Sequence, residues 1–270
     1  MAAILTELRS SRELLINLTL REVRGKYKRT ALGQGWSLLN PLAQLMVFGL
    51  VFGVVIKIQI PPGDPSGLKL FALWLVPGLL PWTYLSNAMT GGMSALLANA
   101  NLIKKVFFPR STLVLSTVFA WNVSFAFELL VLLVVLTIFG SHALLFLPVL
   151  VVFVVLLTAF ALGVAFALAV ANVYFRDTQH FVGILLQVWF YATPIVYPYS
   201  LVQAHGSGLI ETLYRLNPME RFVTAFRNIL YDGRFPSAGD SLFLLVASAL
   251  TLVVGYWVFQ RYEGRLAEEL

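Results

Sequence analysis

The sequence predicts an all-α integral membrane protein, and two observations carry this prediction. Of the 270 residues, 59% are hydrophobic and only 12% are charged, whereas an ordinary soluble domain has roughly 45–50% apolar and about 25% charged residues. The scattered charges leave apolar gaps longer than the 18 or so residues that predict a membrane-spanning helix. We therefore expect a single membrane domain over residues 1–270.

Six apolar runs predict six transmembrane helices, because each is long enough at about 1.5 Å per residue to cross roughly 30 Å of hydrocarbon. The runs cover residues 38–56, 70–96, 113–139, 144–171, 180–199 and 241–260. Pro77 and Pro81 interrupt the second run, so we expect a kink or a re-entrant start there. Small residues at four-residue steps predict close helix packing. These are Gly49, Gly53, Ala159, Gly163, Ala167 and Ala171.

The distribution of basic residues predicts that both termini are cytoplasmic. With six spans, the N-terminus, the loops 97–112 and 172–179 and the C-terminus share one side, which holds thirteen of the nineteen Lys and Arg residues. The positive-inside rule places that side in the cytoplasm. The first 30 residues lack the apolar core of a signal peptide, so we expect insertion to rely on the first span.

Residues 1–35 predict an amphipathic helix along the inner membrane surface. An apolar stripe and a polar, largely basic stripe lie side by side at helical spacing. The apolar stripe is Ile16, Leu20, Val23 and Tyr27, and the polar stripe is Asn17, Arg21, Arg24 and Lys28. A basic cluster that only sets the topology is the alternative interpretation.

The segment 201–240 is too polar to span, because four basic and four acidic residues lie among its apolar ones. Asn217-Pro218-Met219-Glu220 predicts a helix start, with Asn as N-cap, Pro at the first position and Glu reaching back from the third. Phe222, Phe226 and Ile229 then share one face, and Asp232-Gly233 ends the helix. We expect short re-entrant or gate helices on the outer side. An ordinary capped surface helix is the alternative.

The residue types needed for several kinds of catalysis are absent from the sequence. No cysteine is present, and the three histidines lie far apart without the spacing of a metal site. The only Gly-Lys pair, Gly25-Lys26, is followed by Tyr27 and lacks the pattern of a phosphate-binding loop. We therefore expect a chain that is not an enzyme, with no catalytic residue, metal or cofactor of its own. We attribute the net charge of +6 to topology and expect no nucleic-acid partner.

Glu128 is the only acidic residue in the middle of a predicted span, where a carboxylate is costly and therefore a functional hypothesis. It could be protonated, face a water-filled cavity or bind Asn122. A role in coupling transport to proton movement is a further hypothesis.

Aromatic residues gather at certain levels of the predicted spans. Most are expected to form interfacial belts, but an inward-facing subset could stack on sugar faces. The candidates for this lining are Trp82, Tyr84, Trp121, Phe125, Trp189, Tyr191 and Tyr197. In the loop 97–112, Phe107 and Phe108 are apolar side chains expected to be exposed, which suggests docking to another protein. A solvated positive loop is the alternative.

Several motifs together carry a resemblance that covers nearly the whole chain. They are KYKRTALGQGWSLLNP at 26–41, GLLPWTYLS at 78–86, LIKKVFFPR at 102–110, NVYFRD at 172–177, TPIVYP at 193–198 and LNP at 216–218. In this order and spacing they resemble the membrane subunit of ATP-binding-cassette exporters of the type-two permease family, in the branch that exports O-antigen, teichoic acid and capsular polysaccharide.

The resemblance implies a homodimer in the bacterial inner membrane, bound to two copies of a cytoplasmic ATPase that would bind the ATP and Mg²⁺. The substrate would be a polyprenyl-pyrophosphate-linked glycan that enters from the inner leaflet, among membrane lipids. The implied ATPase-coupling surface is Arg21, Arg24, Lys28, Lys104, Lys105, Phe108, Pro109, Arg110, Arg176 and Asp177. The implied outer gate includes Asn217, Pro218, Phe222 and Phe226.

Three other functions stay open from the sequence. An exporter of a smaller amphiphile, such as a drug or a lipid, has the same fold requirements. A membrane-embedded transferase acting on polyprenyl phosphates needs clustered acidic residues near a cytoplasmic loop, and only Asp177 lies in the predicted inner loops. A non-catalytic scaffold is the third.

Overall fold

The computed structural model describes residues 12–26, 28, 30–33, 35–106, 108–205 and 208–269, and every regular element in these ranges is a helix. The helices in chain order are α2 (Arg12–Lys26), α3 (Gly35–Phe48), η1 (Gly49–Val55), α4 (Phe71–Ala98), α5 (Ala100–Lys105), α6 (Ser111–Ile138), η2 (Ala143–Phe146), α7 (Leu147–Tyr174), α8 (Thr178–Tyr191), α9 (Tyr199–His205), α10 (Gly208–Leu216), α11 (Pro218–Arg227), η3 (Asn228–Asp232), α12 (Ala238–Glu263) and α13 (Leu266–Glu269). Tyr27 and Phe107 lie outside the described residues.

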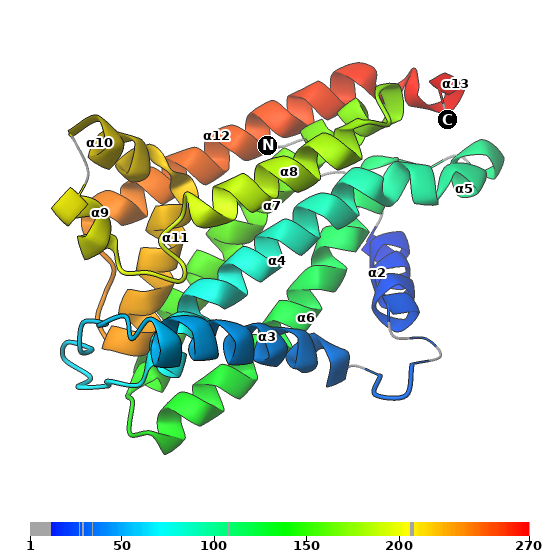
Figure 1. Ribbon diagram of the computed structural model, residues 1–270. Helices are drawn as coiled ribbons and strands as arrows, with labels where there is room; N and C mark the ends of the chain where they lie inside the picture. Colours follow the sequence, from blue (N-terminus) through cyan, green and yellow to red (C-terminus); the bar gives the residue numbers. More distant parts are fainter. Residues whose placement is uncertain are drawn as a thin grey trace.

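Long helices that run side by side form the body of the molecule (Figure 1). Helix α7 packs against both α12 and α4, and α4 packs against α6. Helices α5 and α13 lie at one end of this bundle, and α9 and α10 lie at the other (Figure 1). The two groups of short helices therefore lie at opposite ends of the bundle.

Four of the six predicted spans are confirmed as helices long and apolar enough to cross a membrane. They are Leu38–Val55, Ser111–Ile138, Ala143–Tyr174 and Ala238–Glu263. Helix α4 has the length, with 28 residues, but Pro77, Pro81 and several polar residues make its sequence less apolar. Helix α8 has only 14 residues. Both helices nevertheless lie where the second and fifth spans were predicted.

Helix α8 ends earlier than the predicted span 180–199. Its last residue is Tyr191, and the chain then turns through residues 192–198 without helical structure. Pro194 explains the stop, because a proline has no backbone N–H and disfavours helical geometry in the residue before it. The segment that follows is nevertheless buried, since Thr193, Ile195 and Val196 have at most 1% of their surface exposed.

Helices α7 and α12 touch backbone to backbone at a pair of glycines. A Cβ atom on Gly255 would collide with the carbonyl of Gly163, and one on Gly163 would collide with the backbone of Thr251 and Leu252. Close packing at Gly163 is therefore confirmed. In the first predicted glycine ridge, a Cβ on Gly49 would have no neighbour within 4 Å, whereas one on Gly53 would lie 3.4 Å from the Phe71 ring of α4. Only Gly53 therefore lies close to a neighbouring helix.

Helix α11 starts as predicted but is buried more deeply than a surface helix. The Asn217 side chain accepts a hydrogen bond from the Met219 backbone N–H at 3.0 Å, and Pro218 takes the first helical position. The second half of the predicted cap is wrong: the Asn217 N–H donates to the Tyr214 carbonyl, and Glu220 accepts from the Thr224 hydroxyl at 3.1 Å.

After α11, the π-helical segment η3 continues to Asp232 and ends at Gly233, which has a left-handed φ of 75°. This end is the predicted one. Phe222, Phe226 and Ile229 are fully buried and share the predicted face. Helix α11 packs against α4, α7 and α12, so the bundle encloses most of it.

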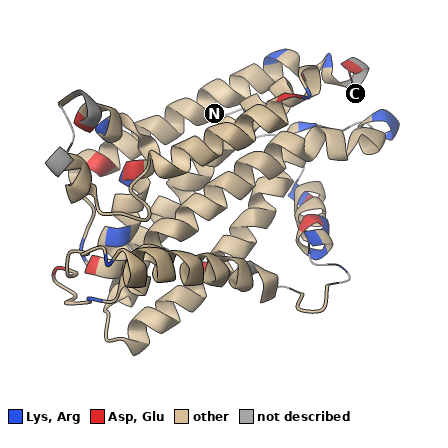
Figure 2. Ribbon diagram, in the orientation of Figure 1, with Lys and Arg blue, Asp and Glu red and all other residues tan. Residues whose placement is uncertain are grey.

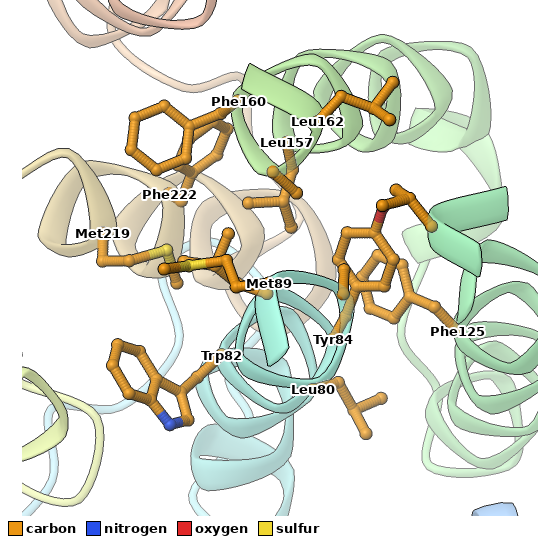
Figure 3. Packing of buried hydrophobic residues seen from close by; sticks show 14 of the residues in the cluster. Leu80, Trp82, Tyr84, Met89, Phe125, Leu157, Phe160, Leu162, Met219 and Phe222 are labelled. Atoms are coloured by element: carbon orange, nitrogen blue, oxygen red, sulfur yellow. The ribbon is translucent and has the colours of Figure 1, made fainter. Parts of the chain in front are cut away.

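Aromatic contacts join these helices in the core. Figure 3 shows Tyr84 facing Phe125, and the two rings are stacked with centroids 4.7 Å apart. Phe222 lies beside Phe160, with centroids 6.0 Å apart (Figure 3). Lipid tails are as apolar as these rings, so close packing between helices stabilises such contacts more than the hydrophobic effect does, and a favourable aromatic pair contributes about 0.5–1.5 kcal/mol. The core therefore fixes α11 to the long helices.

Helix α2 packs against α6 at one end of the bundle. Leu14, Leu15 and Leu18 contact the core, while Ile16 and Leu20 of the predicted apolar stripe are exposed. The helix therefore has apolar side chains both towards the protein and away from it.

Candidate functional site

A groove between α3, α4 and α8 brings aromatic rings and uncharged polar side chains together. Its cavity has a volume of about 420 Å³. We call it the aromatic groove, and the residues that line it are Gln44, Phe48, Trp82, Ser86, Thr90, Gly183, Leu186, Gln187, Phe190 and Tyr191. None of these residues is charged at neutral pH.

The rings of the aromatic groove contact one another across three helices. Phe190 of α8 stacks on Phe48 of α3 with centroids 5.7 Å apart, and it lies 5.7 Å from Trp82 of α4. Trp189 meets Trp82 edge to face at 5.7 Å. Such ring clusters hold their geometry because edge-to-face and stacked pairs are favourable beyond the area they bury.

The polar side chains give the groove both hydrogen-bond donors and acceptors. Gln44 and Gln187 each carry an amide with two donors and one carbonyl acceptor, and Ser86 and Thr90 carry hydroxyls. The Thr90 hydroxyl donates to the Ser86 carbonyl at 2.8 Å, and its oxygen can still accept a hydrogen bond. The arrangement can therefore bind hydroxyl groups and stack on apolar ring faces without holding a charged group.

The structure brings some of the predicted lining residues to the groove and leaves others elsewhere. Trp82 and Tyr191 line it, and Trp189 packs directly behind Trp82. Tyr84 and Phe125 stack on each other in the core.

The two remaining lining candidates lie outside the groove. Trp121 lines a separate cavity. The Tyr197 hydroxyl donates to the Tyr191 carbonyl at 2.7 Å and lies 3.0 Å from the Tyr214 hydroxyl.

Sequence reasoning missed most of the polar lining. Gln44 and Gln187 were overlooked because each stands alone in an apolar run, although a lone amide inside such a run is itself a signal. Phe48 and Phe190 looked like ordinary members of a span. Their shared groove depends on helix positions that the sequence does not give.

Asn217 connects the aromatic groove to helix α11. Its side-chain oxygen accepts a hydrogen bond from the Trp189 indole N–H at 2.8 Å, and its amide donates to the Thr193 hydroxyl at 3.0 Å. Of the other predicted gate residues, Pro218 begins α11, while Phe222 and Phe226 are core residues with none of their surface exposed. Only Asn217 therefore reaches towards the groove.

Arg227 is a functional candidate that the sequence analysis did not single out. Its guanidinium donates to the carbonyls of Pro194 and Ile195 at 2.7 and 2.5 Å, and to that of Trp74 at 3.3 Å. It also lies 3.6 Å from the centroid of the Trp74 ring. Gly78 makes room for it, since a Cβ there would lie 2.8 Å from Nη2.

Arg227 therefore satisfies carbonyls that the irregular segment 192–198 leaves without helical partners. Glu220 lies two turns earlier on the same side of α11. Burial raises the pKa of its carboxyl above the ordinary value.

The residues predicted for the ATPase-coupling surface gather at one end of the bundle, around α2, α5, the α7–α8 turn and the end of α12 (Figure 2). Arg21 donates to the Asn99 side-chain oxygen at 2.6 Å, which joins α2 to the α4–α5 junction. The Arg110 backbone N–H donates to the Glu263 carboxylate at 2.9 Å, and its guanidinium donates to the Glu263 carbonyl.

The remaining members of this predicted surface differ in exposure. Arg24, Lys28, Lys104, Lys105, Arg176 and Asp177 are exposed. Phe108 and Pro109 are half-buried, and Phe108 packs against the core. The group therefore combines exposed charges with a partly anchored apolar loop.

In the described part of the chain, no group of three or more His, Asp or Glu side chains lies close enough to hold a metal ion. Glu128 lines a cavity, and whether that cavity holds water, as one of the three hypotheses for Glu128 requires, stays a prediction. Asn122, its suggested partner, accepts a hydrogen bond from the Thr158 hydroxyl at 2.9 Å.

The long apolar helices and the groove between them define the class of protein, a helical integral membrane protein. The family model described as ABC-2 type transporter matches residues 13–231. The chain therefore belongs to the ABC-2 type transporter family.

Curated relatives match all or nearly all of the chain. The O-antigen export system permease protein RfbA of Myxococcus xanthus is 34% identical over 274 residues, which is 100% of both chains. A protein of the same name from Klebsiella pneumoniae is 29% identical over 96% of this chain and 95% of its own. The polysialic acid transport protein KpsM of Escherichia coli is 25% identical over 91% of this chain and 92% of its own.

Proposed function

We propose that this chain is the transmembrane subunit of an ATP-driven exporter that moves a lipid-linked polysaccharide across the bacterial inner membrane. The polymer would be of the O-antigen, teichoic acid or capsule type. The relatives support this class of substrate, because their names describe O-antigen export or polysialic acid transport.

The aromatic groove is the observation that carries the proposal. A sugar ring has apolar faces and a rim of hydroxyls, so rings such as Trp82 and Phe190 beside the amides of Gln44 and Gln187 complement it. Because no charged residue lines the groove, each sugar is held by weak contacts. A polymer can then slide from one set of contacts to the next.

In our proposal the working unit is a homodimer in which two aromatic grooves face each other. Helices α3 and α8 both line the groove, and both carry exposed large apolar side chains, among them Val47 and Ile184. A second copy would cover these side chains and close the groove into a channel. Two copies of an ATPase would complete the transporter.

The proposed ATPase site is the coupling surface of α2, α5 and the α7–α8 turn. ATP and Mg²⁺ would be bound by the ATPase, and this chain would supply no catalytic group. The location of this surface opposite α9 and α10 favours an arrangement in which both termini are cytoplasmic and the 201–240 helices form the outer gate. We assign α4 and α8 as the second and fifth of six spans, with α2 along the inner membrane surface.

The proposal is tested with the purified chain and its ATPase, reconstituted together in vesicles with a lipid-linked glycan. The double variant Gln44→Leu, Gln187→Leu should lower the rate of glycan export at least about tenfold, because it removes both amide groups, whose hydrogen bonds contribute about 1 kcal/mol each. The matched control is Met46→Leu, Val188→Leu, on the same helices outside the groove lining. Equal export by both variants would refute the assignment of the groove.

Transport of a smaller amphiphile is the competing outcome. If wild-type vesicles export a drug-sized or lipid amphiphile but not the glycan, the chain is still an exporter subunit. The assignment of a polysaccharide as its substrate is then wrong.

A further inference from the structure

A second polar cavity lies between α2, α3, α4 and α6 and shares no residue with the aromatic groove. Its volume is about 330 Å³. We call it the head cavity, and it is lined by Lys26, Asn40, Pro41, Thr83, Asn87, Trp121 and Glu128. The lining holds one cationic and one acidic side chain.

Lys26 has no anionic partner in this cavity. Its Nζ atom is buried without a hydrogen-bond partner and lies 3.2 Å from the centroid of the Trp121 ring. Glu128 and Glu22 act on Lys26 only through longer-range attraction, because none of the ion pairs among the described residues joins them to it. A buried ammonium without hydrogen bonds is costly. A bound ligand that accepts hydrogen bonds from Lys26 would offset this cost.

An apolar cavity of about 560 Å³ adjoins the head cavity. It lies between α3, η1, α4 and α6, and Pro41 and Glu128 line both cavities. We call it the chain cavity. Glu128 is the only charged residue in its lining, which is otherwise formed by residues such as Leu45, Phe71, Leu132 and Val135.

We propose that the head and chain cavities together bind one zwitterionic phospholipid that has a primary amine in its head group. The phosphate would bind the Lys26 ammonium, the lipid ammonium would bind Glu128, and a hydrocarbon chain would occupy the chain cavity. This site is separate from the aromatic groove and does not depend on what the groove carries.

Charge complementarity selects this occupant over an anionic lipid. One Lys and one Glu give the head cavity no net charge, which matches a head group with one positive and one negative charge. A pyrophosphate would bring several negative charges next to Glu128 with a single Lys to balance them. The amides of Asn40 and Asn87 and the Thr83 hydroxyl can bind the remaining phosphate and ester oxygens.

The geometry also separates a primary amine from a quaternary one. A primary ammonium donates three hydrogen bonds, as the lysine side chain does, so it can bind the Glu128 carboxylate directly. A choline group has no N–H donor. We therefore expect phosphatidylethanolamine to bind more tightly than phosphatidylcholine.

The test is the binding of three lipids with the same acyl chains to the full chain in detergent, followed by native mass spectrometry. Phosphatidylethanolamine should bind about tenfold more tightly than phosphatidylcholine or phosphatidylglycerol. Lys26→Gln should weaken all three about tenfold, because each loses its phosphate contact. Glu128→Gln should weaken phosphatidylethanolamine alone and abolish its advantage over phosphatidylcholine.

Controls keep the result specific to the cavities. Lys69→Gln and Glu13→Gln remove exposed charges elsewhere and should leave binding unchanged. Ala72→Trp places a bulky ring at an exposed position of the chain cavity lining and should block lipid without touching the charges. Glycerophosphoethanolamine, the head group without chains, should bind far more weakly than the lipid.

Other outcomes overturn the proposal in defined ways. If phosphatidylglycerol binds best and Glu128→Gln strengthens it further, the site takes an anionic phosphate lipid. If glycerophosphoethanolamine binds as tightly as the lipid, the chain cavity plays no part. If neither Ala72→Trp nor Lys26→Gln changes the binding of any lipid, these cavities are not a lipid site.

Discussion

Arg227 shows how one buried side chain can hold three distant segments. It binds carbonyls at Trp74, Pro194 and Ile195, which lie at the start of α4 and in the irregular segment after α8. Removing such a partner leaves buried carbonyls unsatisfied, and each of these costs about 1–3 kcal/mol.

We predict that Arg227→Met lowers the stability of the protein by at least about 3 kcal/mol, because it leaves three buried carbonyls without their hydrogen-bond donor. Thermal unfolding in detergent measures this loss. Arg234→Gln is the control, because its side chain is exposed and pairs with Asp232 at the surface. A variant as stable as this control would contradict the role assigned to Arg227.

A second prediction concerns Asn217. Asn217→Asp keeps the oxygen that accepts from Met219 and Trp189 but loses the amide that donates to Thr193 and Ala192. Asn217→Ala loses both, including the helix cap, which contributes about 0.5–2 kcal/mol. We expect Asp to keep most of the stability and Ala to lose it in thermal unfolding. Equal losses would show that the cap plays little part.

A third prediction follows from Lys26. Burial lowers the pKa of Lys26 to about 7, against the opposing effects of Glu128 and Glu22, while the unfolded value is 10.5. Between these values the unfolded chain binds more protons at this position than the folded chain, so stability rises with pH in that window.

Lys26→Met should remove this contribution. The gain in thermal stability between pH 7 and pH 9, measured without added lipid, should therefore be smaller in the variant than in the wild type. An identical gain in both would contradict the assignment.

At this scale the sequence predicted what local chemistry decides. The Asn217 cap needs only its next two residues, so it was predicted correctly. The Glu220 partner was wrong because the Asn217 N–H already donates to Tyr214, a contact that depends on how α10 meets α11. Arg227 was missed because its partners lie 32 to 153 residues away in the chain.

Among the helices, α7 and α12 have the closest contact, and it depends on glycine. We predict that Gly255→Leu separates the two helices and destabilises the protein by several kcal/mol, because the new side chain must displace the backbone of Gly163. Gly239→Ala in the same helix is the control. A Cβ there meets nothing within 4 Å, so it should stabilise α12 slightly. Thermal unfolding of the two variants compares them directly.

The helices themselves were largely readable from apolar runs, which explains why the spans at 113–139, 144–171 and 241–260 were placed within a few residues. Helix α8 differed because hydropathy does not register the backbone cost of Pro194. The run from Ala192 to Pro198 is apolar, but it is buried as irregular chain whose carbonyls Arg227 binds. Its burial therefore depends on tertiary contacts.

On the scale of the whole molecule, we predict that the coupling surface binds the ATPase. We predict that Phe108→Asp with Pro109→Ala prevents co-purification with the ATPase and lowers ATP turnover of the mixture to that of the ATPase alone. Phe235→Asp is the control, because Phe235 is also an aromatic side chain but lies before α12, at the other end of that helix from Glu263.

If the double variant still binds the ATPase, the ATPase binds at another part of the chain. Since Phe108 also packs against the core, the melting temperature of the variant alone must match that of the wild type for the loss of binding to count.

The family could be predicted from motifs spread along the chain, because their order and spacing are sequence properties. The groove and the two cavities could not, since each forms where three or four helices meet. Trp82 and Trp121 look alike in the sequence, yet they face different cavities on α4 and α6.

The Gly255–Gly163 contact lies closer to one end of α12 than to the other. Glu263 binds Arg110 near one end of the helix, Asp240 binds Arg221 at 2.8 Å near the other, and Gly255 touches Gly163 between them. At about 1.5 Å per residue, Gly255 lies about 12 Å from Glu263 and about 22 Å from Asp240 along the helix. By this geometry alone, a rotation of α12 about the glycine contact would move its Asp240 end nearly twice as far as its Glu263 end.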